Sequence, residues 1–96
     1  MAKVTAENLE PIHIRAARAL LGFSTKELAA LMSGYGNTHM RLRNFEAGRA
    51  APPGLRLALV ELMDQCGIEL QNGGRPGARV KDPDVFNAVV EAQSSP

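Results

Sequence analysis

Helix start and stop signals, repeated in quick succession, constrain the fold of this chain more than any other feature. Pro11 suits a first helical turn and Gly22 suits a C-terminal cap, so a helix is predicted between them. Its apolar residues recur at spacings of three and four, which is the spacing of one helix face: Ile14, Ala17 and Leu21. This punctuation favours several short helices packed together.

The next two predicted helices flank a glycine-containing turn. Ser24 followed by Glu27 is the reciprocal pattern of a capping box, which predicts a helix from Thr25. That helix ends in a turn over residues 33–36, and a third helix is predicted from residue 37 or 38 to 46. The residues expected to face inward from the two helices are Leu28, Ala29, Leu31, Met32, Leu42 and Phe45.

The period then changes from that of a helix to that of a strand. Residues 55–66 carry the apolar pattern of a fourth helix, which Gly67 ends. Period two follows in residues 68–70 and 78–80, on either side of a turn-rich segment, which predicts a β-hairpin. Asp82 and Pro83 are expected to begin a short amphipathic helix. The predicted fold class is mainly α: four to five helices with a short β-hairpin and a short C-terminal helix.

Composition agrees with a small helical domain. Only 4% of the residues are aromatic and none is Trp, so aliphatic residues and Met must form the core. The single cysteine, Cys66, excludes an internal disulfide framework and a thiolate metal cluster. Neither a signal-peptide pattern nor an apolar run of about 20 residues is recognised, so a cytoplasmic protein without a membrane span is expected.

Charge is distributed unevenly along the chain. Residues 1–56 hold eight Lys or Arg against four acids, a net charge of +4, whereas residues 57–96 hold three against six, a net charge of −3. The basic half is the candidate for phosphate binding. Ordinary scatter of solvated charge remains an open alternative. The basic residues concerned are Lys3, Arg15, Arg18, Lys26, Arg41, Arg43, Arg49 and Arg56.

Residue patterns across the first four predicted helices carry a family resemblance. The stretch IRAARALLGFSTKELAALM, the later LRNFEAG and the helix after it resemble the Cro/C1-type (XRE-like) helix-turn-helix family of phage repressors and bacterial regulators. The most specific parts are R-x-x-x-G-x-S-x-x-E-L-A from Arg18 to Ala29 and F-E-x-G from Phe45 to Gly48, although the turn is longer than usual. The segment GIELQNGGRPGARV is similar to an appendage often found behind this domain. The resemblance implies a helix-turn-helix domain over residues 11–66 and an appendage over residues 67–92.

The resemblance also implies which residues contact double-stranded DNA. The third helix becomes the recognition helix, with Thr38 near its N-cap and base contacts from His39, Met40, Arg43 and Asn44. Arg can pair with guanine, Asn with adenine, and Met can touch a thymine methyl group. Phosphate contacts are expected from Ser24, Thr25, Lys26, Arg41 and Arg49. Simpler roles stay open: His39 as a solvated residue, Met40 as a partly buried filler, and Ser24 and Thr25 as helix caps only.

Two further pairings are predicted. In the family pattern, Arg18 and Glu46 form a partly buried ion pair between the first and third helices. In the hairpin, pairing Ile68 with Val80 and Leu70 with Ala78 brings the apolar residues to one face and sets Glu69 opposite Arg79. Such a hairpin needs a surface to cover its apolar face, and a second subunit is the predicted one. The expected dimer interface is Ile68, Leu70, Ala78, Val80, Val85, Phe86 and Val89.

Two functions from different classes stay open. One is a sequence-specific transcriptional regulator that binds a pseudo-palindromic operator as a homodimer. The other is an antitoxin-like protein that regulates its own synthesis while residues 81–96 hold a protein partner. Exposure of the apolar face of the last helix would favour the second. An enzyme is not expected, because no catalytic constellation can be assembled, and no cofactor or metal is expected, since His13 and Cys66 are isolated.

Overall fold

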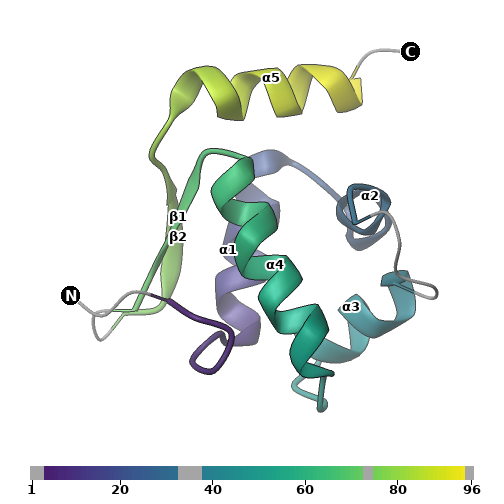
Figure 1. The fold of residues 1–96 in the computed structure, drawn as a ribbon. Helices are drawn as coiled ribbons and strands as arrows, with labels where there is room; N and C mark the ends of the chain where they lie inside the picture. Colours follow the sequence, from purple (N-terminus) through teal and green to yellow (C-terminus); the bar gives the residue numbers. More distant parts are fainter. Residues whose placement is uncertain (1–3, 33–37, 73–74, 95–96) are drawn as a thin grey trace.

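Seven elements follow one another in the order that the sequence predicts. The computed structural model describes residues 4–32, 38–72 and 75–94. The elements are α1 (Pro11–Leu21), α2 (Thr25–Ala30), α3 (Thr38–Glu46), α4 (Pro53–Gln65), β1 (Ile68–Gln71), β2 (Gly77–Val80) and α5 (Pro83–Ser94) (Figure 1). The mainly helical fold class is confirmed. Three predicted features lie outside the described residues: the turn over residues 33–36, a helix start at residue 37, and the Gly73-Gly74 part of the hairpin loop.

Most helix ends are where their capping residues predict them. Gly22 ends α1 in the left-handed region at φ +73°, and its N–H bonds to the Arg18 carbonyl oxygen at 2.9 Å. At the start of α2, the Glu27 N–H donates to Ser24 Oγ at 3.1 Å and the Ser24 N–H donates to Glu27 Oε1 at 2.9 Å. The fourth helix begins at Pro53 rather than at Leu55. Proline fits that first position because the N–H it lacks would have no helical partner there.

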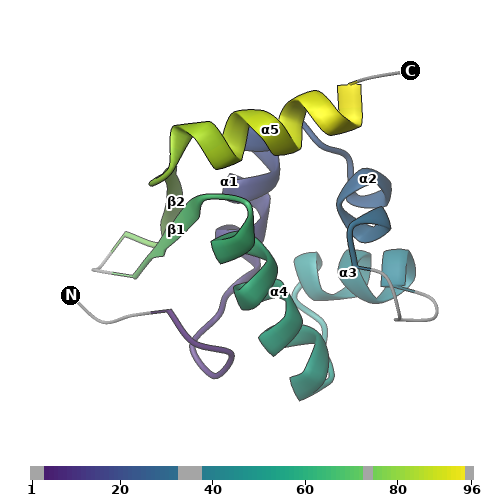
Figure 2. The ribbon, with the colours of Figure 1, turned by 45° about the horizontal axis from the view of Figure 1, so that its top comes forward.

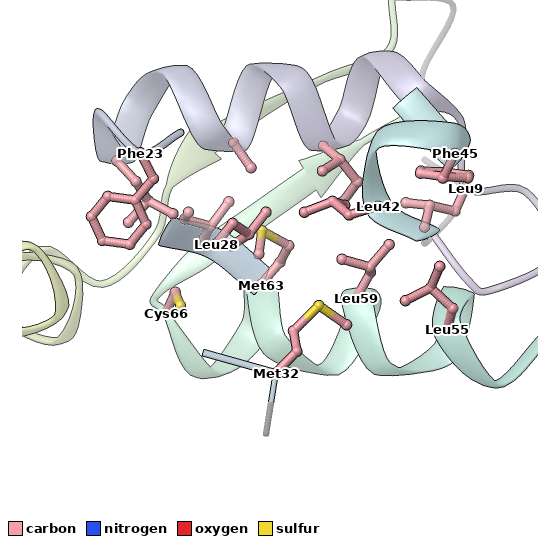
Figure 3. Packing of buried hydrophobic residues seen from close by; sticks show 14 of the residues in the cluster. Leu9, Phe23, Leu28, Met32, Leu42, Phe45, Leu55, Leu59, Met63 and Cys66 are labelled. Carbon is pink, nitrogen blue, oxygen red and sulfur yellow. The ribbon is translucent and has the colours of Figure 1, made fainter. Parts of the chain in front are cut away.

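The core lies between α1 and α4. Figure 3 shows side chains from α2, α3 and α4 converging in this space. Its largest fully enclosed residues include Phe45, Ile14 and Leu28, all at or below 1% exposure. The core also contains Val4 and Ile68. The packed unit therefore extends beyond both ends of the predicted domain of residues 11–66.

The hairpin has the predicted register but a different covering surface. Ile68 pairs with Val80, Glu69 with Arg79 and Leu70 with Ala78. The strands pack on their own chain, with α1 against both strands and α4 against β1. Ile68 is only 2% exposed, so the prediction that it contacts a second subunit is wrong. The hairpin follows α4 after one turn and folds back, so that α1 and α4 of the same chain cover this face.

Gly67 makes that turn possible. It has φ +74°, and its carbonyl oxygen accepts hydrogen bonds from the N–H groups of Lys81 and Asp82 at 2.8 and 3.1 Å. The start of the hairpin is thereby tied to its end. A Cβ on Gly67 would lie 2.6 Å from the Asp82 carbonyl oxygen, so no side chain fits here.

The segment before α1 is part of the same structure, which sequence patterns did not predict. Val4 and Leu9 are buried in the core. Arg56 holds the segment in place, because its Nη1 donates to the carbonyl oxygens of Ala6 and Leu9 at 3.0 and 3.1 Å. The same guanidinium lies 5.4 Å from the ring centroid of Phe45, within cation–π range.

The last helix, α5, lies along one end of the molecule, away from α3 (Figures 1 and 2). Asp82 caps it as predicted, accepting the Val85 N–H on Oδ1 at 3.3 Å. The side chains of Phe86, Val89 and Val90 pack against the core, whereas Val85 is 38% exposed. No helix in the described ranges has the length and apolar character needed to cross a bilayer.

Candidate nucleic-acid interface

The helix α3 has one buried face and one exposed face. Leu42 and Phe45 point into the core as predicted, together with Thr38 and Glu46. Positions 40, 43, 44 and 47 follow one another at spacings of three and four on the opposite face. The exposed side chains of the helix are Met40 (66% exposed), Arg41 and Arg43, while Asn44 is half-buried. The only carboxylate of α3, that of Glu46, is buried, so its exposed face is free of negative charge.

An ion pair anchors the buried face. Arg18 of α1 donates from Nη2 to Glu46 Oε1 at 2.8 Å and from Nε to Oε2 at 3.1 Å, which is a bidentate contact. The predicted pair is therefore present. The remaining nitrogen, Nη1, donates to the Phe23 carbonyl oxygen at 3.1 Å. Arg15 adds a hydrogen bond to the backbone carbonyl of Glu46, so two arginines of α1 hold the end of α3.

Two of the residues predicted to contact DNA bind each other. Thr25 Oγ1 and His39 Nε2 lie 3.1 Å apart, and both side chains are half-buried. This bond joins the first turn of α2 to the first turn of α3, two helices that pack directly on each other. His39 and Thr25 therefore have a structural role, which neither the solvated interpretation of His39 nor the capping interpretation of Thr25 included.

Thr38 departs further from its predicted role. It is the first residue of α3 rather than the residue before it, and it is 6% exposed. Its side chain is enclosed by the protein, which removes it from the surface that could meet DNA.

At its other end α3 closes with a Schellman motif. Gly48 has φ +86°, its N–H donates to the Phe45 carbonyl oxygen at 3.0 Å, and the Arg49 N–H donates to the Asn44 carbonyl oxygen at 2.9 Å. This turn brings two predicted DNA contacts together. Arg49 Nη1 donates to Asn44 Oδ1 at 2.9 Å.

The structure separates the basic residues of the first half into two groups. Arg15, Arg18 and Arg56 make internal hydrogen bonds, so they are structural residues. Lys26, Arg41, Arg43 and Arg49 are exposed, and all four lie on α2, on α3 or directly after α3. Lys3 lies outside the described residues. The exposed positive charge of this half therefore includes a group beside the outer face of α3, in addition to Arg15 on α1. Ser24 is also exposed there, although its Oγ already caps α2.

His13 has a structural place that its sequence neighbourhood did not reveal. It is fully buried, its Nδ1 accepts the Glu10 N–H at 2.9 Å, and its Nε2 donates to the Gln71 carbonyl oxygen at 2.9 Å. A carbonyl can only accept and an amide N–H can only donate, so the ring carries its single proton on Nε2. His13 thus connects the start of α1 to the end of β1. No local sequence pattern predicts this hydrogen bond, because Gln71 lies 58 residues after His13.

Cys66 is a free cysteine whose side chain is buried. Burial raises the pKa of the Cys66 thiol by desolvating its charged form, which lowers its reactivity. Among the described residues, no group of three or more His, Cys, Asp or Glu side chains could hold a metal ion. A cavity of about 580 Å³ lies against α4 and β1, and none of its lining residues belongs to α2 or α3.

The predicted dimer residues divide between the two appended elements. In the hairpin, Leu70 and Ala78 pack against the core of their own chain, and Val80 is half-buried. On α5, Val85 is exposed and Phe86 and Val89 are half-buried. Of these seven predicted residues, Val85 is therefore the one that is exposed.

Comparison with known proteins returns no relative. No family model, no curated protein and no solved structure matches this chain.

Proposed function

We propose that this protein is a sequence-specific, double-stranded DNA-binding transcriptional regulator that acts in the cytoplasm as a homodimer. The observation that carries the proposal is the outer face of α3. It presents Met40, Arg43 and Asn44 without a carboxylate and has exposed cations on both sides. Arg and Asn are the side chains best suited to reading base edges in the major groove. This face agrees with the resemblance to the helix-turn-helix family.

Physical support comes from the rigidity of the opposite face. A base-reading helix must keep its side chains in a fixed geometry, and α3 is held at both ends. The bond between Thr25 and His39 holds its start, while Arg18 and Arg15 hold its end at Glu46. The exposed cations Lys26 and Arg41 would contact phosphates, which position the helix but carry no sequence information.

A partner-binding, antitoxin-like function has weaker support. Its segment, residues 81–96, includes Phe86, Val89 and Val90, which already pack against the core of the same chain. Val85 alone is an exposed large apolar residue there. A single such residue is common on soluble proteins and does not require a foreign partner.

The proposal is tested by selection from a random double-stranded DNA library, followed by sequencing of the bound fragments. The parent protein should enrich one motif. Arg43→Ala should weaken binding to that motif by about 1–3 kcal/mol and relax the preference at one base pair. Arg41→Ala is the matched control, since it should weaken motif and random DNA alike and lower the salt slope by roughly one.

Two outcomes would count against this function. Failure of the parent protein to enrich any motif at low salt would reject sequence-specific binding. Equal losses on motif and random DNA for Arg43→Ala would reduce this residue to a phosphate contact.

A further inference from the structure

We infer that Arg49 is a positioning residue that presets Asn44 as a hydrogen-bond donor, so that Asn44 selects guanine over adenine at its base pair. The inference rests on the proposed DNA-binding function and goes beyond it, because it assigns a base preference and a residue that controls it. It also changes the role of Arg49, which family resemblance implies to be a phosphate contact alone.

The backbone builds this pair. In the Schellman motif that ends α3, the residue after the left-handed glycine returns to the residue five positions earlier. Here these residues are Arg49 and Asn44, and the Arg49 N–H donates to the Asn44 carbonyl oxygen at 2.9 Å. An apolar contact between the two side chains commonly accompanies this motif. In this chain a polar contact takes its place, 2.9 Å from Arg49 Nη1 to Asn44 Oδ1.

Donor and acceptor chemistry then fixes the orientation of the amide. A guanidinium has five N–H donors and no acceptor, so the amide atom that faces Arg49 must be the carbonyl oxygen. Oδ1 keeps one further lone pair, whereas Nδ2 keeps both of its hydrogens. Within the part of the chain that the structure describes, no other group receives a hydrogen bond from Nδ2. The amide that remains for a ligand is mainly a donor.

An amide that can mainly donate matches different base edges in the major groove from an amide that can both donate and accept. Guanine presents two neighbouring acceptors, N7 and O6, whereas adenine presents the acceptor N7 beside the donor N6. The usual pairing of asparagine with adenine uses both ends of the amide, Oδ1 to accept and Nδ2 to donate. Arg49 occupies the accepting end, which favours guanine. Without Arg49, Oδ1 is released and adenine becomes the better match.

The experiment compares base preferences in selected DNA. Asn44→Ala first identifies the base pair that Asn44 contacts, as the position whose preference disappears. At that pair the parent protein should prefer guanine, and Arg49→Ala should shift the guanine-to-adenine ratio toward adenine by roughly tenfold. Arg49→Ala keeps Gly48 and both backbone hydrogen bonds of the turn, so the end of α3 stays intact. Arg41→Ala removes the same charge from α3, the helix that Arg49 follows, and should leave the ratio unchanged.

A measurement without DNA tests the pair itself. In NMR spectra of the free protein, Arg49→Ala should shift the side-chain amide signals of Asn44 and leave those of exposed Asn87 in place. Unmoved Asn44 signals would overturn the preset orientation.

The failures of the inference and of the proposed function are distinguishable. If Arg49→Ala weakens all sequences alike and keeps the base preference, Arg49 is a phosphate contact only and the inference is wrong, while DNA binding stands. If the parent protein enriches no motif, the proposed function fails and this inference fails with it.

Discussion

Among single residues, two Glu–Arg ion pairs within the described part of the chain differ in burial and not in distance. Arg18–Glu46 and Arg79–Glu69 both close at 2.8 Å. The side chains of the first pair are 26% and 7% exposed, and those of the second are 61% and 37% exposed. Water can replace a lost partner in the second pair but has little access to Glu46 in the first. The two pairs should therefore differ in their contribution to stability.

Neutralising each glutamate tests this difference. Glu46→Gln should lower the free energy of unfolding by about 1.5–3 kcal/mol, because it removes charge-assisted hydrogen bonds from a nearly enclosed position. Glu69→Gln, the matched control, should cost less than about 1 kcal/mol, since its pair is exposed. Urea denaturation followed by circular dichroism measures both. Equal midpoints for the Glu46→Gln variant and the parent would show that the buried pair adds no stability.

Individual residues also show how position overrides side-chain type. Thr38, His39 and Asn44 are all polar residues of one short helix, and each has the chemistry for a base or phosphate contact. Thr38 is enclosed, His39 bonds to Thr25, and Asn44 bonds to Arg49. Met40 and Arg43 are the fully exposed side chains of the outer face, and Asn44 is half-buried beside them.

Between elements, the connection from α4 to the hairpin depends on a glycine in a position closed to side chains. Gly67 combines a positive φ with the approach of the Asp82 carbonyl oxygen and the Phe86 N–H group, which begin α5. The turn therefore joins three elements: the end of α4, both ends of the hairpin and the start of α5. Backbone contacts carry this connection, so a side-chain change elsewhere cannot replace it.

Substituting alanine at two glycines separates this effect from helix propensity. Gly67→Ala should destabilise the protein by about 1–3 kcal/mol, because a left-handed conformation and a clash with backbone must both be tolerated. Gly54→Ala is the control: Gly54 lies in α4, has open space around its Cα, and should be neutral or more stable by up to about 1 kcal/mol. Thermal unfolding measures both changes. A Gly67→Ala variant that melts like the parent would show that the turn can relax.

Across the whole molecule, α5 lies along one end, and α3 lies beside α4, away from α5 (Figures 1 and 2). The hairpin packs on α1 and α4, so the hairpin cannot offer the open apolar face that a dimer needs. We therefore predict that the proposed dimer forms through α5, where Val85 is exposed. Contact through α5 leaves the outer face of α3 free for DNA.

A charge placed on each side of α5 tests the dimer. Val85→Glu should convert a dimer into monomers, because a carboxylate would be buried against its own copy without a partner. Asn87 is exposed and lies two positions away on another face of the helix, so Asn87→Glu should leave the dimer intact. Sedimentation at high micromolar concentration measures the mass of each protein. A parent protein that is already monomeric, or a Val85→Glu variant that remains dimeric, would remove α5 from the interface.

Local sequence patterns were sufficient for the elements because their physical causes are local. The Ser24–Glu27 capping box, the Pro and Gly helix ends and the alternation in the hairpin act within a few residues, and each appears as predicted. The Arg18–Glu46 pair was also predictable, though from family resemblance rather than from the spacing of its residues. The inward positions of α3, Leu42 and Phe45, were predicted from helical periodicity, which is a local pattern.

Tertiary structure alone decided what covers each surface. Hydrogen bonds between residues distant in the sequence are one example: His13 bonds to Gln71, and Thr25 bonds to His39. Burial is another, because the side chains of Thr38, Val4 and Ile68 are enclosed by parts of the chain that lie far from them in the sequence. The sequence indicated that the hairpin needed a covering surface but not which one, because an apolar face has no direction or specificity of its own. The surface that covers the hairpin is formed by α1 and α4 of the same chain, and this became visible only in the tertiary structure.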